Sequence, residues 1–124
     1  LKKYPEVKGI LGTSSFDAPG TARAIDELGL KGSVFTAGTG MPAANAQILK
    51  DGSVSALTLW DPADAGYALA SLATKILKGE KIEDGVDLGV EGYENMHFAP
   101  GSNKVLEGNG WLKITKDNVD SLGF

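Results

Sequence analysis

The chain has 124 residues, enough for one domain with a modest core, and its 42% hydrophobic and 23% charged residues are ordinary values for a globular protein. A net charge of −4 without any basic run argues against nucleic acid as a partner. The absence of cysteine excludes disulfides and thiolate metal sites, and a single histidine, His97, argues against a histidine metal site or a Ser-His-Asp triad, so we expect no metal and no cofactor.

The first predicted element is a strand over residues 7–11, because this short apolar run is typical of a buried parallel strand. A small polar loop over residues 12–16 follows it. Asp17 is expected to cap the next helix, and Gly29 is expected to end it. The pattern is therefore strand, loop, helix.

Two further units repeat this pattern. They consist of a strand at 34–37, a loop at 38–41 and a helix at 42–50, and then a strand at 54–59 and a helix at 62–78. Asp61 is expected to cap the last helix and Pro62 suits its first turn, so Trp60 stands where a strand ends and a helix begins. Three such units predict an α/β fold with a parallel sheet and flanking helices.

The remainder of the chain is polar and rich in glycine. The sequence predicts short strands at 88–90 and 96–98, a strand at 111–114 with Trp111 packed into the sheet, and a helical turn at 117–122. None of these segments is long enough for another strand–helix–strand unit. We therefore expect the tail to return and pack on the existing scaffold.

Three parallel strands leave little core and two open sheet edges. Lys2 and Lys3, followed by a Tyr-Pro-Glu step, are typical of the end of a preceding helix. No stretch is apolar enough to span a bilayer, and no signal peptide is visible. We expect the fold to be completed by a missing segment or by a second chain.

The loops that follow the three strands should meet at one edge of the sheet, where open α/β sheets bind ligands. Their hydroxyls, free backbone N–H groups, carboxylate and aromatic face suit a small polyol or sugar. The residues concerned are Thr13, Ser14, Ser15, Thr39, Gly40, Trp60 and Asp61. In the alternative interpretation the hydroxyls and Asp61 only cap helices, and Trp60 belongs to the core.

Other chemistries fit less well. The glycines of residues 38–42 suit a phosphate, but the P-loop lysine and the third glycine of a dinucleotide motif are missing, so a tight turn is favoured. Ser14 and Ser15 do not lie in a Gly-x-Ser-x-Gly motif, and His97 stands in the irregular tail, where a packed or surface role is favoured. The candidate acid–base carboxylates all stand at helix starts, where capping explains them: Asp17, Asp61 and Asp64. We therefore predict that the chain is not an enzyme.

Several segments resemble the carboxyl-terminal half of the periplasmic sugar-binding proteins, the type I receptors of ABC importers, in the branch that binds rhamnose or autoinducer-2. They are Tyr4–Ile10, Glu27–Gly32, Lys50–Val54, Leu59–Pro62 and the ending Gly108–Phe124. The Leu-Trp-Asp step and the ending are specific to the branch, and the other segments are general to the superfamily.

The resemblance implies a periplasmic-binding-protein-like I fold, in which two flavodoxin-like lobes joined by a hinge close on one ligand. In this chain that architecture would be incomplete. Residues 1–60 would be part of the second lobe. Residues 61–90 would be a crossover helix and strand that pack on the first lobe, and residues 91–124 would be a returning tail.

The resemblance also implies ligand contacts at three places: Thr13 to Ser15, Thr39 with Gly40, and Leu59 with Trp60. Autoinducer-2 receptors carry proline and alanine where Thr13 and Ser15 stand, which favours a sugar. Ribose receptors carry an aspartate where Gly40 stands, which argues against ribose.

The expected function is the solute-binding component of a bacterial ABC sugar importer, with a small sugar and the membrane permease as partners. The expected location is the periplasm, or the outer surface of a Gram-positive cell with a membrane anchor. Three alternatives remain open: an autoinducer-2 receptor, the effector-sensing domain of a sugar-responsive transcription regulator, and a small α/β enzyme. A DNA-binding segment upstream would favour the regulator, and the enzyme would need a catalytic base.

Overall fold

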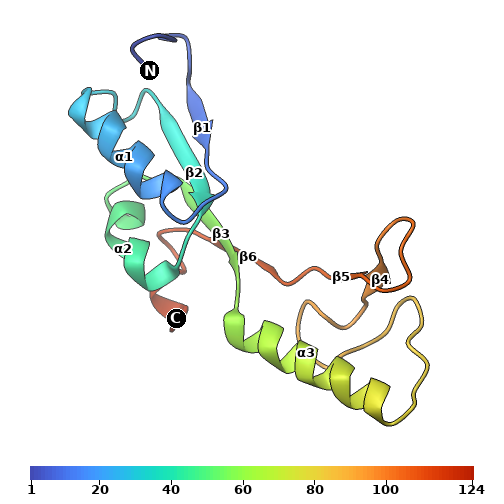
Figure 1. Ribbon diagram of the computed structural model, residues 1–124. Helices are drawn as coiled ribbons and strands as arrows, with labels where there is room; N and C mark the ends of the chain where they lie inside the picture. The colour runs from blue at the N-terminus through green and yellow to red at the C-terminus, as the bar shows by residue number, and fades with distance from the viewer. The chain divides into compact units, whose positions relative to one another are not determined.

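The computed structural model describes residues 1–124, and the chain divides into two compact units (Figure 1). Unit 1 consists of Leu1–Leu59 and Lys113–Phe124, and unit 2 consists of Trp60–Leu112. The chain therefore leaves unit 1 once and returns to it once. Each unit has its own buried residues.

A four-stranded sheet organises unit 1. Its strands lie in the order β1 (Gly9–Leu11), β2 (Phe35–Thr39), β3 (Ala56–Trp60) and β6 (Trp111–Ile114). β1 pairs in parallel with β2, and β2 pairs in parallel with β3, so the predicted parallel α/β sheet is confirmed. The pairs include Leu11 with Ala37 and Thr39 with Thr58.

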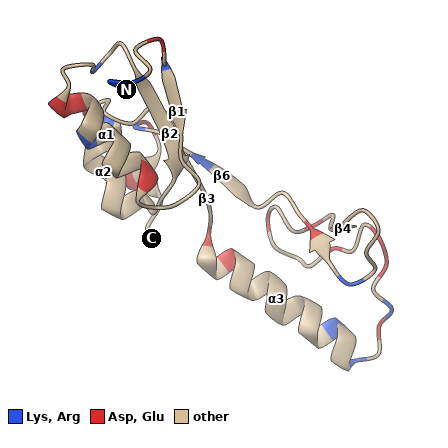
Figure 2. Cartoon of the chain, turned by 45° about the horizontal axis from the view of Figure 1, so that its top comes forward, with Lys and Arg blue, Asp and Glu red and all other residues tan.

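The helices α1 (Asp17–Glu27) and α2 (Pro42–Lys50) lie together on one face of this sheet (Figures 1 and 2). α1 turns Ala18, Ala22 and Ile25 inward, at the spacing of one helix face. Between the helices and the sheet lies an apolar core. Its buried members include Ala18, Ala22, Ile25, Val34, Leu49, Val54, Leu57, Leu59, Ile114 and Val119.

The opposite face of the sheet is bare. Gly9 pairs with Phe35, and Leu11 pairs with Ala37, so these four residues share one face. Phe35 is 56% exposed and Leu11 is 84% exposed. Parallel sheets are ordinarily covered on both faces, and this one is covered on one.

The end of the chain packs against α2. After β6, the 3₁₀ turn η1 (Val119–Ser121) buries Val119, and the backbone N–H of Ala43 donates to the carbonyl oxygen of Phe124 over 3.2 Å. Lys50 Nζ donates to Asp120 Oδ1 over 2.6 Å. β6 therefore adds a strand beside β3, and the chain end covers α2.

Unit 2 consists of α3 (Pro62–Leu77) and an irregular segment that contains the antiparallel strands β4 (His97–Phe98) and β5 (Leu106–Glu107). Ala68 on α3 packs with Leu88 and Met96 of this segment. Asp61 caps α3 as expected, because its carboxylate accepts the N–H of Ala63 over 2.7 Å. Asp61 and Asp64 place negative charge at the positive end of the helix dipole (Figure 2).

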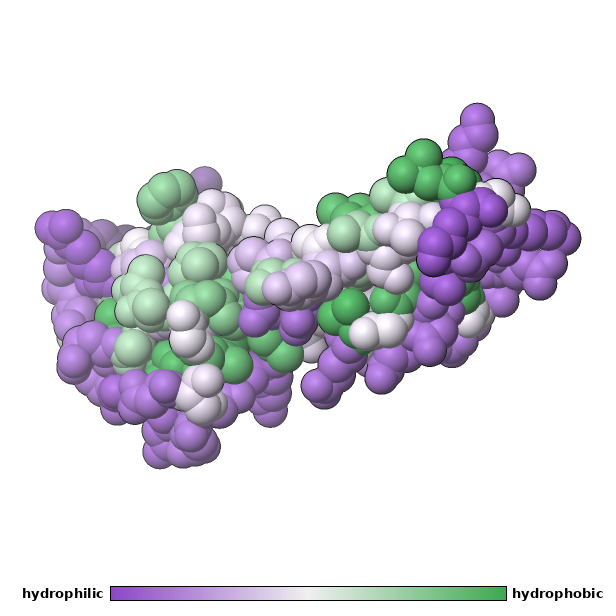
Figure 3. Space-filling model, turned by 90° about the horizontal axis from the view of Figure 1, so that it is seen from below, coloured by the Kyte–Doolittle hydropathy of each residue, from purple (hydrophilic) through white to green (hydrophobic).

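Another side of α3 exposes large apolar side chains to solvent. Leu69, Ile76 and Leu77 are 68%, 56% and 88% exposed. Figure 3 shows hydrophobic surface between the hydrophilic regions of the molecule. The incomplete cover of both units agrees with a chain that spans only part of a larger architecture.

Several predicted details are wrong. Asp17 does not cap α1, whose N-cap position is Phe16 without a side-chain hydrogen bond. Residues 88–90 form no strand, because Leu88 is held by its buried side chain and not by a strand partner. No helix includes Lys2 or Lys3, and the second strand extends through Thr39, which was expected in a loop.

Candidate functional site

The loop after β1 presents three hydroxyl side chains. Thr13, Ser14 and Ser15 are all exposed, as the sequence predicts for a ligand-binding edge. Asp17 fixes this loop, because its Oδ2 accepts the backbone N–H groups of Thr13 and Ser14 over 3.0 and 2.9 Å. These two N–H groups are therefore not free for a ligand, contrary to expectation, and the hydroxyls are what the loop offers.

One further hydrogen bond anchors the same loop, and Gly12 leaves room for Asp17 beside it. The N–H of Gly12 donates to the carbonyl oxygen of Ala37 over 3.0 Å, which ties the end of β1 to β2. A Cβ atom at Gly12 would collide with the side chain of Asp17. Glycine at this position allows the carboxylate to approach the loop from α1.

Phe16 is a site candidate that sequence reasoning missed. It stands in the same loop as the three hydroxyl residues and is 82% exposed. The signal was present in the sequence, since a large aromatic residue after a run of small polar residues in a loop has no helical or strand periodicity to satisfy.

The end of β2 offers one hydroxyl and one tightly packed glycine. Thr39 is half-buried and pairs with Thr58 of β3, so the two threonines share one face of the sheet. Gly40 is buried, and a Cβ atom there would lie 2.9 Å from Asn45 Nδ2 and 3.3 Å from Leu57 Cδ1. Thr58 is exposed and is a second residue that sequence reasoning missed.

The last two residues of β3, Leu59 and Trp60, were both predicted to contact the ligand, but they face opposite sides of the sheet. Leu59 is only 8% exposed and belongs to the core, so it can meet a ligand only through its backbone. Trp60 points to the other face, because neighbouring strand residues alternate, and it is 43% exposed. The interpretation of Trp60 as a core residue therefore does not hold.

Trp60 is held by a second tryptophan. The ring of Trp111 meets it with 5.3 Å between ring centroids and 88° between ring planes, an edge-to-face arrangement. Trp111 was expected inside the sheet, but it is 56% exposed. Its ring contacts Trp60, and the sequence gives no signal for this contact between residues that are 51 positions apart.

Asp61 lines a small hollow of about 150 Å³ in unit 2. The same hollow is lined by Asp64, Tyr93, Asn109 and Trp111, among others. One oxygen of Asp61 accepts the N–H of Ala63, so capping uses part of this carboxylate. Asp61 and Trp60 fall in unit 2, whereas the other predicted site residues fall in unit 1.

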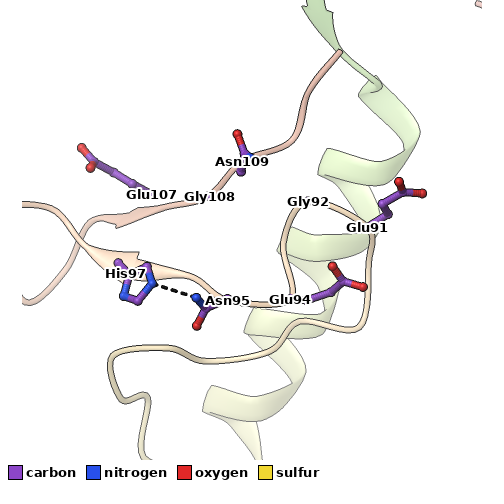
Figure 4. A pocket seen from close by; sticks show the side chains of 8 residues that line it. All are labelled: Glu91, Gly92, Glu94, Asn95, His97, Glu107, Gly108 and Asn109. Atoms are coloured by element: carbon purple, nitrogen blue, oxygen red, sulfur yellow. Dashed lines mark hydrogen bonds between the residues drawn. The ribbon is translucent and has the colours of Figure 1, made fainter. Parts of the chain in front are cut away.

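A larger hollow of about 630 Å³ lies in the irregular segment of unit 2 (Figure 4). Its lining includes His97 and the three carboxylates of Glu91, Glu94 and Glu107. The sequence analysis did not predict that these four residues lie together. His97 Nε2 lies 2.9 Å from Asn95 Nδ2, and its Nδ1 lies 2.9 Å from Asp84 Oδ2. This arrangement fixes the ring at the rim of the hollow.

The carboxyl group of Asp84 belongs to the same hydrogen-bond network. The pKa of its carboxyl group is lowered, first by the side-chain hydrogen bond to His97 and then by the backbone N–H of Phe98, which donates over 2.7 Å. No group of three or more histidine, aspartate or glutamate side chains is arranged to hold a metal ion.

The strand ends of unit 1 thus present hydroxyl groups on a sheet edge, and the last residue of β3, Trp60, is an exposed aromatic. In open α/β sheets, ligands generally bind outside this edge. The chain belongs to the periplasmic binding protein family, since the model of the "periplasmic binding protein domain" matches residues 1–81. No helix combines the length and apolar character needed to cross a membrane.

Three solved structures share the fold. A sugar ABC transporter from Actinomyces odontolyticus matches with a TM-score of 0.80 and 29% identity, over 100% of this chain and 39% of that chain. LsrB from Clostridium saccharobutylicum in complex with AI-2 matches with 0.70 and 22% identity, over 100% and 42%. GanP, a glucose-galactose binding protein from Geobacillus stearothermophilus, matches with 0.70 and 20% identity, over 95% and 35%. The chain spans about two fifths of the length of these proteins, and the predicted family and fold class are confirmed.

Proposed function

We propose that this chain is the carboxyl-terminal part of a sugar-binding protein that serves a bacterial ABC importer. The observation that carries the proposal is Trp60, an exposed aromatic ring at the carboxyl end of β3 in a periplasmic binding protein fold. A sugar offers C–H faces that pack on such a ring and hydroxyl groups that need hydrogen-bond partners.

The polar partners in this proposal are the hydroxyls of Thr13, Ser14, Ser15 and Thr39. The first three are exposed on a loop whose backbone Asp17 holds at Thr13 and Ser14, so little backbone freedom is lost at these two residues when a ligand binds. Gly40 contributes by its lack of a side chain, and Leu59 by its backbone. Asp61 supplies the second oxygen of its carboxylate.

The lobe assignment is part of the same proposal. Residues 1–60 belong to the second lobe, residues 61–90 pack on the first lobe, and residues 91–124 return. The division of the chain after Leu59 and the bare faces of β1, β2 and α3 support this assignment. A missing amino-terminal lobe or a second chain supplies the opposite wall of the cleft.

The mechanism is capture by closure. A ligand that contacts both lobes only in the closed form shifts the balance toward that form, which then meets the membrane permease. This places the protein in the periplasm, or outside a Gram-positive cell on a membrane anchor. The protein binds and releases its ligand without chemical change.

An autoinducer-2 receptor is the second candidate. The likeness of the whole chain to LsrB in complex with AI-2 favours it. Thr13 and Ser15, which replace the proline and alanine of such receptors, favour a sugar. Titration of one preparation with both ligand classes decides between the two candidates.

The test uses a form of the protein that carries both lobes. Thermal unfolding and calorimetry are measured with L-rhamnose, D-galactose, D-glucose, D-ribose and autoinducer-2. We expect one sugar to raise Tm and Trp60→Ala to weaken its binding about tenfold, the loss expected from an aromatic platform. Trp60→Phe keeps an aromatic face and should retain most of the affinity.

Tyr67→Ala is the matched control, because Tyr67 is an exposed aromatic residue of α3 outside the proposed site. It should leave affinity unchanged. Sugar affinity that is the same in Trp60→Ala and in the wild type would refute the proposed site. The isolated 124-residue chain should bind the same sugar only weakly, and micromolar affinity in that chain would contradict the missing wall.

A further inference from the structure

Trp60 does not stand alone in unit 2. Its ring contacts the ring of Trp111 at 5.3 Å between centroids and with the planes at 88°. The two residues are the last residue of β3 and the first residue of β6, so each ring projects from the end of a hydrogen-bonded strand. Both rings remain about half exposed, at 43% and 56%.

We propose that Trp111 is the positioning residue of Trp60, and that it fixes the orientation of the aromatic face on which the sugar packs. This inference rests on the proposed function and deepens it. In an edge-to-face pair, the edge of one ring meets the face of the other. Trp111 therefore covers at most one face of Trp60 and leaves the other face open.

The energetic argument concerns rotation of the Trp60 side chain. An exposed tryptophan at the end of a strand has several staggered rotamers, and a ligand that stacks on one of them must bear the entropy of selecting it. The edge-to-face contact selects one rotamer before the ligand arrives. The sugar then binds a preformed surface, so removal of Trp111 lowers affinity although Trp111 need not touch the sugar.

The position of the pair in the chain adds a second consequence. Trp60 is the first residue after the chain leaves unit 1, and Trp111 is the second residue before it returns at Lys113. The pair therefore joins the two connecting segments to each other by a side-chain contact, next to the backbone pairing of β3 and β6. A sugar that stacks on Trp60 acts on both segments and not on one.

The test uses the NMR signals of the two indole N–H groups, one from each of the two tryptophans of the chain. They are assigned in nitrogen-15 NMR spectra with Trp60→Phe and Trp111→Phe. Without ligand, Trp111→Ala should shift the Trp60 signal, because the ring current of its neighbour is lost. An unchanged Trp60 signal would overturn the contact itself.

Titrations with L-rhamnose, D-galactose and D-ribose then follow both indole signals in the wild type and the remaining indole signal in each variant, a method that detects weak binding by the 124-residue chain. We expect Trp111→Ala to raise Kd about fivefold, in proportion to the usual contribution of an aromatic pair, and Trp111→Phe to stay within about twofold. Tyr67→Ala should leave Kd unchanged. Thermal unfolding of each variant shows that it is folded.

The outcomes separate the two proposals. A saturable shift that Trp60→Ala abolishes and Trp111→Ala leaves unchanged overturns the positioning role and keeps the proposed function. A larger loss in Trp111→Ala than in Trp60→Ala makes Trp111 the platform, which also overturns the inference. If no sugar shifts the Trp60 signal, here or in a form with both lobes, the proposed function fails and the inference fails with it.

Discussion

Asp17 Oδ2 accepts the backbone N–H of Thr13 over 3.0 Å, from four residues further along the chain. The same oxygen accepts the N–H of Ser14, so one carboxylate oxygen holds two successive residues of the loop after β1. The loop conformation is therefore set from α1, and the hydroxyls of the candidate site depend on a residue that does not belong to it.

Asp17→Ala should release this loop. Two hydrogen bonds to a charged acceptor are lost at an exposed position, so we expect a decrease of about 1 kcal/mol in the free energy of unfolding. The measurement is urea unfolding together with amide hydrogen exchange. Exchange at Thr13 and Ser14 should accelerate, while exchange in α2 stays as in the wild type, and equal acceleration in both would contradict a local effect.

Thr36→Val should stabilise unit 1. Thr36 is 2% exposed, and its Oγ1 atom has no hydrogen-bond partner. It lies on the helix-covered face of β2, since Gly38 on the same face would place a Cβ 3.4 Å from Cβ of Ala18. Removing an unsatisfied buried hydroxyl should raise the free energy of unfolding by about 1 kcal/mol.

Thr58→Val is the control for that change, because Thr58 is exposed and its Oγ1 donates to the carbonyl oxygen of Gly38 over 3.4 Å. It should leave stability within about 0.5 kcal/mol of the wild type. A lower Tm for Thr36→Val than for Thr58→Val would show that the hydroxyl of Thr36 is satisfied in solution.

Gly40→Ala should destabilise unit 1, because the added methyl group would lie 2.9 Å from Asn45 Nδ2 and 3.3 Å from Leu57 Cδ1. Overpacking of this kind costs about 1–3 kcal/mol. Gly20→Ala is the matched control, since Gly20 lies inside α1 with no atom within 4 Å of the added methyl group. It should gain about 0.5–1 kcal/mol, and a common sign for the two changes would contradict the packing described for Gly40.

Asp84→Asn should destabilise the irregular segment of unit 2 in a pH-dependent manner. The pKa of Asp84 is lowered from its ordinary value of 3.8, chiefly by the hydrogen bond to His97. A lowered pKa means that the stabilisation is present above pH 3.8 and is lost as the pH falls through the lower pKa of the folded state. Glu107, which pairs with His97 across β4 and β5, and Glu91 and Glu94, which line the same hollow as His97, are the other carboxylates near the ring.

The measurement is Tm against pH for wild type and Asp84→Asn. The difference between them should shrink as the pH falls below about 4. A difference that grows as the pH falls from about 4 to about 2 would contradict the lowered pKa of Asp84.

Much of the secondary structure could be predicted because its signals are local. The apolar runs before Gly12 and Gly38, and the helix starts at Pro42 and Pro62, each depend on neighbouring residues alone. Asp61 illustrates this, since the cap predicted from its position is present. The exposed edge of Thr13 to Ser15 follows from the same local pattern and the parallel sheet.

The rest depended on contacts between distant residues. Asp17 has the sequence signature of a cap, and only the folded loop shows that its carboxylate is directed backward to Thr13. The run at Leu88 resembles a strand because it is apolar, although its apolar side chains pack on α3. Trp111 alternates as a strand residue should, and its partner Trp60 could not be read from that alternation.

The division of the chain gives unit 1 an unusual assembly order. Along the chain, Leu1–Leu59 come before all of unit 2, and the strand that completes the sheet beside β3 follows only afterwards. Unit 2 is an insertion between the two segments of unit 1, and bringing the ends of a long insertion together has an entropic cost that grows slowly with its length. The edge of the sheet at β3 therefore stays unpaired until β6 has been synthesised, and an unpaired strand edge is a site at which chains can aggregate.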